Sequence, residues 1–229
     1  MHGRKVQAQE DTAQGPKTVH ASVPPTGDAA WSIDLERHGK DRKKMTGGLG
    51  MTAKKISGVE IECVRADIAS QYGMTAVVNA ANAQLRIGGG VAGAIHRAAG
   101  PGLEEECRPL APIKPGQAVI TSGHNLPNRY VIHCVGPVYG VDKPEAELLA
   151  NCYRNALRLA EEHGIDSIAF PAISTGAFGY PVEDAAEVAF SAVLEAIPKL
   201  KSVKKIRFVL HSERDLMLHE KVLETKTAQ

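Results

Sequence analysis

The stretch QLRIGGGVAGAIHRAAG, residues 84–100, sets three consecutive glycines directly before a run with the apolar spacing of a helix. Glycine has no Cβ, so Gly88, Gly89 and Gly90 would let a ligand approach the backbone closely. The first N–H groups of the following helix lack intrahelical partners and favour an anion. The spacing matches neither the G-x-G-x-x-G nor the G-x-x-x-x-G-K-[ST] fingerprint. Taken alone, such a glycine cluster would favour a surface turn, but NAAN directly follows a predicted strand and puts two amides, Asn79 and Asn82, beside it.

The segments around this stretch alternate between strand-like and helix-like patterns. Runs rich in β-branched residues and bounded by breakers predict strands at 59–64, 75–80, 117–121, 129–135, 167–173 and 205–210. Helical spacing of apolar residues predicts helices at 145–164, 181–197 and 213–224. This alternation is typical of an α/β fold in which helices pack on a largely parallel sheet. We expect one domain over residues 51–229.

Residues 1–50 have a different character. They contain turn and breaker residues throughout and no apolar periodicity, apart from SIDLERHGK (32–40), which predicts at most a helical turn. Such a segment buries too little apolar area to offset its ordering entropy. We therefore expect a mostly disordered tail.

Composition narrows the classes of function. The chain has 229 residues with a net charge of +1, so it lacks the basic field that binding of nucleic acid requires. No apolar run approaches the roughly 20 residues of a membrane span. The four cysteines, Cys63, Cys107, Cys134 and Cys152, form no C-x-x-C pair. They favour reduced, buried thiols in a cytoplasmic protein over disulfides or a zinc site.

Two further loops have ligand-binding chemistry where predicted strands end. In AISTGAFGYP (172–181), the residues Ser174, Thr175, Gly176 and Ala177 could offer consecutive N–H groups to phosphate oxygens, although a plain connector is an equal alternative. In RADI (65–68), Asp67 could accept a hydrogen bond from an exocyclic amine such as that of adenine, or simply cap a helix. In open α/β sheets, ligands lie outside the carboxyl ends of the strands.

The motifs VVNAAN, GGGVAGAIHRAAG, YVIHCVGP and AFPAISTGAFGYP, in this order, resemble the macrodomain family of ADP-ribose-binding modules, most closely its MacroD-type branch. The resemblance runs from about Val59 to about Glu224. It implies a three-layer α/β/α sandwich around a mixed, largely parallel sheet, with ADP-ribose in a cleft at its crest. It implies no cofactor and no metal.

The resemblance also assigns residues to parts of the ligand. Asp67 would contact the adenine amine, Ile68 would frame the base, and His211 would stack on it. Asn82 would bind the distal ribose, with Asn79 bracing the loop. The pyrophosphate would lie between Gly88, Gly89, Gly90, Val91 and Ala92 on one side and Ser174, Thr175, Gly176, Ala177 and Phe178 on the other, with Phe178 over the distal ribose.

Two positions depart from the MacroD-type pattern. Ile87 stands at the first glycine of the usual four, and Ala92 stands where that branch has an acid linked to hydrolysis. Ala92 cannot accept a proton. In macrodomains with a small residue there, a water between the ligand phosphate and the glycine loop is the proposed nucleophile. His96, four residues later on the same helix face, is a candidate catalytic helper beside Asn82, or a packing residue.

Three functions follow as hypotheses. The first is hydrolysis of acyl-linked ADP-ribose, either O-acetyl-ADP-ribose or mono-ADP-ribosylated Asp/Glu. The second is a non-catalytic reader of ADP-ribose or ADP-ribosylated proteins, which Ala92 favours. The third, a dinucleotide-dependent oxidoreductase, lacks its glycine fingerprint.

Overall fold

The computed structural model describes residues 52–228. The tail predicted for residues 1–50, including the helical turn at 32–40, lies outside this range. The strands are β1 (Ala53–Ile56), β2 (Val59–Arg65), β3 (Ala76–Ala80), β4 (Ala118–Ser122), β5 (Tyr130–Cys134), β6 (Ser167–Pro171) and β7 (Lys205–Leu210). The α-helices are α1 (Gly90–Ala99), α2 (Pro101–Cys107), α3 (Glu145–Glu162), α4 (Val182–Ala196) and α5 (Glu213–Thr227). Short 3₁₀ turns are η1 (Ile68–Ser70), η2 (Arg108–Leu110) and η3 (Ile197–Lys199).

The strands form one seven-stranded sheet in the order β1-β2-β7-β6-β3-β5-β4. The five inner strands are parallel, whereas β1 and β4 run antiparallel to their neighbours at the two edges. The expected mixed, largely parallel sheet is confirmed. Because parallel strands end at one edge, the segments that follow β2, β7, β6, β3 and β5 all emerge on the same side.

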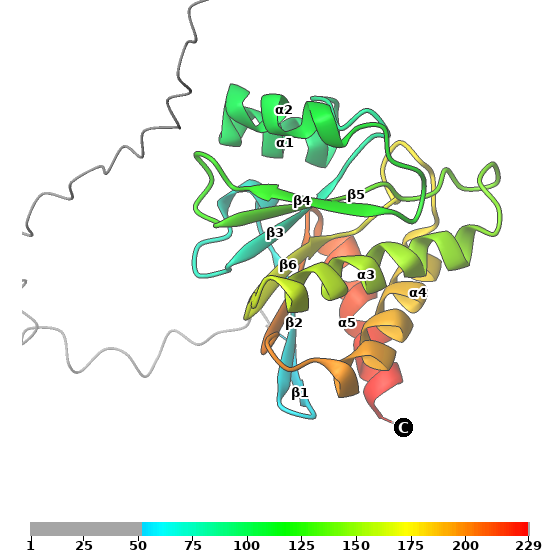
Figure 1. The fold of residues 1–229 in the computed structure, drawn as a ribbon. Helices are drawn as coiled ribbons and strands as arrows, with labels where there is room; N and C mark the ends of the chain where they lie inside the picture. The colour runs from blue at the N-terminus through cyan, green and yellow to red at the C-terminus, as the bar shows by residue number, and fades with distance from the viewer. Residues whose placement is uncertain (1–51, 229) are drawn as a thin grey trace, which may run out of the picture. The chain divides into compact units, whose positions relative to one another are not determined.

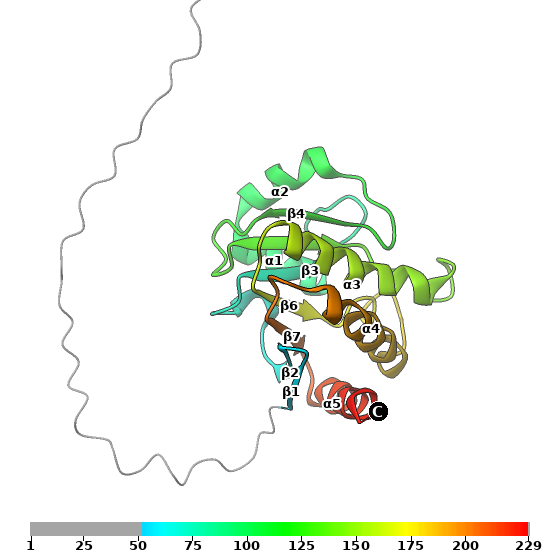
Figure 2. The same cartoon turned by 60° about the horizontal axis from the view of Figure 1, so that its bottom comes forward.

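Helices cover both faces of the sheet. Figure 1 shows α1 and α2 on one face and α3, α4 and α5 on the other, and α4 lies between α3 and α5 in Figure 2. Each face has its own core. Val77 belongs to the cluster beneath α1 and α2, while its neighbours Ala76 and Val78 belong to the cluster beneath the other helices. The strands therefore read as continuous apolar runs, and the three-layer sandwich is confirmed.

Local sequence explains the ends of several helices. Ser212 accepts a hydrogen bond from the N–H of Asp215 and caps α5. Acidic residues occupy the first turn of α4, where the helix dipole favours them. Gly164 follows the end of α3 with φ +62°, a left-handed conformation that suits glycine.

The structure adds elements that the sequence pattern did not predict. Strand β1 reads AKKI, is half exposed and contains two lysines, so it has no apolar alternation. Helix α2 was not predicted, because its seven residues, PGLEEEC, are too few to show helical periodicity; it begins at Pro101, directly after Gly100 with φ +81°. The four cysteines are buried and form no disulfide, as expected. Within residues 52–228, no helix is both long enough and apolar enough to cross a membrane.

Replacing Phe208 with alanine should destabilise the domain by roughly 3–5 kcal/mol, because a large buried ring would leave a cavity. Phe208 is fully buried, with ring centroids 4.5 Å from Phe190 and 5.9 Å from Phe170. Urea denaturation measures the change. Met217→Ala, at a position 62% exposed, is the control and should change stability by less than about 0.5 kcal/mol. Equal effects of the two changes would contradict this account of the core.

Candidate functional site

A pocket of about 280 Å³ opens where β3, β5 and β6 end. Its walls come from the segment after β3 with the start of α1, from the residue two positions after β5, and from the segment after β6. The lining residues are Ala80, Ala81, Asn82, Gly88, Gly89, Gly90, Val91, Ala92, Gly136, Ala172, Ile173, Ser174, Gly176, Ala177 and Phe178. Most of them carry small side chains or none, so backbone groups form much of the surface.

The glycine run forms the wall at the start of α1. Gly89 is the N-cap and Gly90 the first residue of the helix, with φ +52°. A Cβ added at Gly89 or Gly90 would meet nothing within 4 Å, so internal packing does not require glycine there. Gly93 differs, because a Cβ there would lie 2.4 Å from the carbonyl oxygen of Gly88. Open space above free helix N–H groups suits an anionic ligand.

The opposite wall is the loop between β6 and α4. Ser174 has φ +68°, and its buried hydroxyl has no hydrogen-bond partner. The N–H of Tyr180 donates to the Ser174 carbonyl at 3.0 Å, which closes the loop on itself. Thr175 does not line the pocket, because its hydroxyl donates to the Ala172 carbonyl at 2.9 Å. A ligand in the pocket would therefore contact mainly the backbone of this loop.

Gly136 is a site residue that sequence reasoning missed. It lies two residues after β5 and lines the pocket. A Cβ added there would come within 2.1 Å of the Ser174 hydroxyl and 2.7 Å of Ile173 Cγ2. The absence of a side chain at Gly136 therefore leaves the space that the side chains of Ser174 and Ile173 occupy. The motif YVIHCVGP contains Gly136, but only the folded chain brings it against Ser174.

The two asparagines of VVNAAN have different surroundings. Asn79 is fully buried, and its Nδ2 lies 3.1 Å from Nδ1 of His133, its cross-strand partner on β5. The bracing of the loop by Asn79 stays a prediction. Asn82 contacts the loop directly, since its Nδ2 donates to the Arg86 carbonyl at 2.7 Å. Asn82 also lines the pocket, and its contact with a ribose stays a prediction.

Ala92 and His96 lie on successive turns of α1. Ala92 lines the pocket, whereas His96 does not, being 5% exposed behind it. Burial lowers the pKa of His96, although Glu104 opposes this effect, so the ring is neutral at pH 7. Its Nε2 is buried without a hydrogen-bond partner. His96 therefore does not reach the pocket directly.

His96, Cys107 and His133 bring ligand-type atoms within 4.8 Å of one another. Burial raises the pKa of the Cys107 thiol to about 11 and lowers that of His133 to about 3, which keeps both groups neutral. The ring nitrogens of His133 already have partners, Asn79 and, at 2.9 Å, the Thr121 hydroxyl. A metal ion would have to displace one of these bonds. We interpret the cluster as a buried hydrogen-bonded node beneath α1.

The remaining predicted site residues lie beyond the pocket along the same sheet edge. Asp67 is exposed and caps η1 by accepting a hydrogen bond from the N–H of Ala69, as the alternative interpretation of RADI anticipated. Ile68 is buried in η1. His211 is exposed and follows β7, the parallel neighbour of β2. The predicted site residues thus follow four successive strands, β2, β7, β6 and β3.

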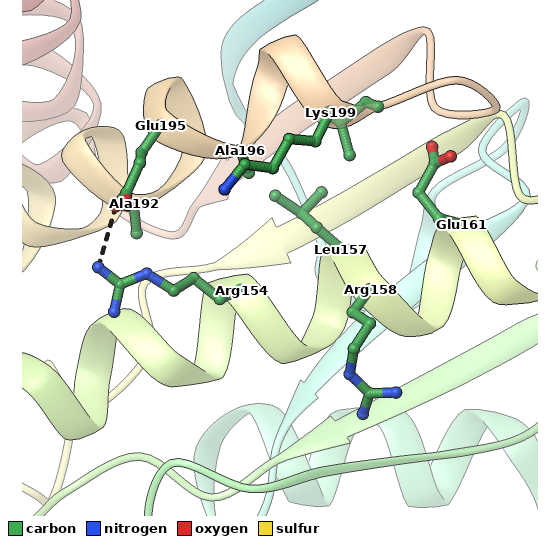
Figure 3. Close-up of a pocket in the computed structure, with 9 residues that line it drawn as sticks. Arg154, Leu157, Arg158, Glu161, Ala192, Glu195, Ala196 and Lys199 are labelled. Atoms are coloured by element: carbon green, nitrogen blue, oxygen red, sulfur yellow. Dashed lines mark hydrogen bonds and ion pairs between the residues drawn. The ribbon is translucent and has the colours of Figure 1, made fainter.

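A second cavity, of about 320 Å³, lies between α3 and α4, away from the strand ends (Figure 3). Leu157, Ala192 and Ala196 contribute apolar surface to it. Several of its polar groups pair with one another or with nearby backbone: Arg154 pairs with Glu195 at 3.0 Å, and the carboxylate of Glu161 accepts N–H groups of residues 201–203. These contacts stabilise the helical layer, so we place the functional site at the sheet edge.

The sequence matches a family model, the Macro domain, over residues 78–189. It is 52% identical to the Macro domain-containing protein CT2219 of Chlorobaculum tepidum over 166 residues, which cover 72% of this chain and 96% of that protein. It is 39% identical to human ADP-ribose glycohydrolase MACROD2 over 202 residues, covering 87% of this chain and 47% of that protein.

Solved structures are similar along the domain. The Oceanobacillus iheyensis macrodomain with ADP has a TM-score of 0.75 and 38% identity, and the match covers 78% of this chain and 97% of that one. The Trypanosoma brucei macrodomain in complex with ADP-ribose has a TM-score of 0.67 and 36% identity, covering 71% and 68%. Together with the pocket between its two side-chain-poor loops, these matches establish that the chain belongs to the macro domain family.

Proposed function

We propose that this macrodomain binds ADP-ribose along the edge where β2, β7, β6, β3 and β5 end and hydrolyses acyl-linked ADP-ribose. The substrates would be O-acetyl-ADP-ribose or proteins mono-ADP-ribosylated on Asp or Glu. The observation that carries the proposal is the pair of facing backbone walls, the glycine run and the 172–178 loop, around one pocket. The relatives described with ADP, ADP-ribose or a glycohydrolase name support it.

The walls suit a diphosphate for electrostatic reasons. The start of α1 supplies unpaired N–H groups and the positive end of the helix dipole, without side chains that would hold a ligand at a distance. The strand order supports this proposal: Asp67 and His211, the proposed base residues, follow the neighbouring strands β2 and β7, Phe178 follows β6, and Asn82 follows β3. An extended nucleotide fits this order.

Catalysis would depend on positioning. Ala92 offers no base, and His96 is neutral and behind the pocket wall. A water held between the bound diphosphate and the glycine run would attack the ester that joins the acyl group to the ribose. The products are a carboxylic acid and ADP-ribose. Orientation and preorganised N–H groups can supply much of such an acceleration.

Ala92 also favours a second function, that of a reader that binds ADP-ribose or ADP-ribosylated proteins without turnover. The reader needs the same two loops and no base. Turnover of a glutamate-linked mono-ADP-ribosylated protein separates the two functions, because tight binding with release no faster than in buffer would leave only the reader. A cytoplasmic location stays a prediction.

Gly90→Glu should abolish ADP-ribose binding, because the carboxylate would enter the pocket and repel the diphosphate. Isothermal titration calorimetry measures the affinity. Gly58→Glu is a matched control, since Gly58 also has a positive φ, +89°, and open space where a Cβ would lie, but belongs to the β1–β2 turn. The control should bind as the unmodified chain does. Retained affinity in the Gly90 variant would refute this site.

Gly136→Ala should weaken ADP-ribose binding by at least about tenfold with the fold intact, because the new methyl group would displace Ser174 and its loop. Circular dichroism checks the fold and calorimetry the affinity. Adding Ser174→Gly removes the closest clash and tolerates φ +68°, so the double variant should recover part of the affinity. Full affinity in the single variant would show that the loop position does not matter.

Ala92→Asp should accelerate label release from a glutamate-linked substrate by on the order of 10²-fold, because a carboxylate there can accept a proton from the water. Ala92→Asn, of the same size without a base, is the control and should not accelerate release. If the Asp variant binds ADP-ribose normally and releases label no faster, the attacking water does not lie beside residue 92.

A further inference from the structure

A buried hydrogen-bond chain links the sheet to the turn that presents Asp67. Asp67 itself is exposed and follows β2, and its Oδ1 accepts the N–H of Ala69 at 2.9 Å. The turn continues into η1, which has only three residues. A helix this short has little stability of its own. Some other contact has to hold the backbone of the turn, and with it Asp67, in place.

Gln71 supplies that contact from the end of the turn. Its side chain is 2% exposed, and its Nε2 donates to the Asp67 carbonyl at 2.6 Å. Its Oε1 accepts a hydrogen bond from Nη1 of Arg207 at 3.1 Å. One buried amide therefore connects the backbone of Asp67 to a charged side chain of β7.

Arg207 is in turn fixed by an ion pair on the sheet. Its Nε donates to Glu62, its cross-strand partner on β2, and Glu62 is 1% exposed. Lys205 Nζ lies 3.0 Å from the second carboxylate oxygen. Burial raises the pKa of Glu62, but bonds from Arg207 and Lys205 outweigh it and hold the pKa below its usual value. The carboxylate stays charged, so the anchor is strong near neutral pH.

The main chain of the same turn has a second support. Asn128, 3% exposed, donates from Nδ2 to the carbonyls of Gln71 at 2.9 Å and Met74 at 2.7 Å. The loop from Gln71 to Met74 is thereby pinned from the side of β5. Asn128 bonds the loop but not Asp67, so within residues 52–228 the side chain that joins the ion pair to Asp67 is that of Gln71.

We propose that Gln71 is a positioning residue for base recognition, which transmits the fixed position of the Glu62–Arg207 pair to Asp67. It holds the Asp67 carboxylate where the exocyclic amine of a purine donates to it, and so sets a preference for adenine over hypoxanthine. This inference rests on the proposed function. It concerns selectivity between bases. A shift of the Asp67 carboxylate by about 1 Å would weaken its directional hydrogen bond to the base amine, while the contacts of other residues with the rest of the ligand would stay as they are.

The test compares the affinities of ADP-ribose and its hypoxanthine analogue, IDP-ribose, by calorimetry. Hypoxanthine carries a carbonyl in place of the amine, so the unmodified chain should prefer ADP-ribose by at least about tenfold. Gln71→Leu removes both bonds and should reduce this ratio to about twofold or less. It should leave the affinity for IDP-ribose within about threefold, because the diphosphate loops are untouched.

Two variants separate positioning from stability. Asn155→Leu removes one side chain–carbonyl bond, to Gly116 at 2.8 Å, and should lower the melting temperature without changing the ratio. Gln71→Glu keeps an acceptor for Arg207 but cannot donate to the Asp67 carbonyl. Gln71→Glu should therefore also lower the ratio of the affinities for ADP-ribose and IDP-ribose. If Gln71→Leu does not fold, the result for Gln71→Glu tests the proposal.

Each result has a distinct meaning. If the unmodified chain binds neither ligand, the proposed function fails, and the inference with it. If it binds both equally, Asp67 does not read the amine and the inference is wrong although the site stands. A ratio that is unchanged in both Gln71 variants also overturns it. A ratio that falls equally in Asn155→Leu would show a general effect of stability.

Discussion

Five parallel strands end at one edge of the sheet, and the whole candidate site depends on that alignment. The pairing of β3 with β6, with Ala76 opposite Ile168, brings the segment after Asn79 beside the segment that begins at Ala172. Neither loop forms a pocket alone. Their facing backbones do, because few side chains fill the gap between them. The two cores beneath and above the sheet keep the strands in register and therefore keep the loops at a fixed separation.

Much of the fold could be predicted from local sequence. The inner strands are buried on both faces and read as apolar runs, and the long helices show clear periodicity and breakers. The edge strand β1 could not be predicted in this way, because AKKI gains its structure only by pairing with β2. The glycine run and the STGAFGYP loop could be predicted as site elements because their residue types are unusual wherever they occur.

The parts of the site that sequence reasoning missed depend on contacts between distant segments. Gly136 matters because Ser174 rests against it, 38 positions along the chain. The side-chain partner of Asn79 is His133 on the neighbouring strand, 54 positions along the chain. The chain from Glu62 through Arg207 to Gln71 joins residues that are far apart in sequence. No local pattern marks any of these pairs.

The lysines of β1 have a consequence for association between molecules. Within the described residues, β1 ends the sheet on one side, and an unpaired strand edge is a template for a strand of another molecule. Lys54 and Lys55 are consecutive, so they point to opposite faces of this four-residue strand. A second copy that paired there would bring like charges together on both faces. The two lysines leave β1 without the apolar alternation that would predict a strand. They thus also discourage fibril-like growth of the sheet.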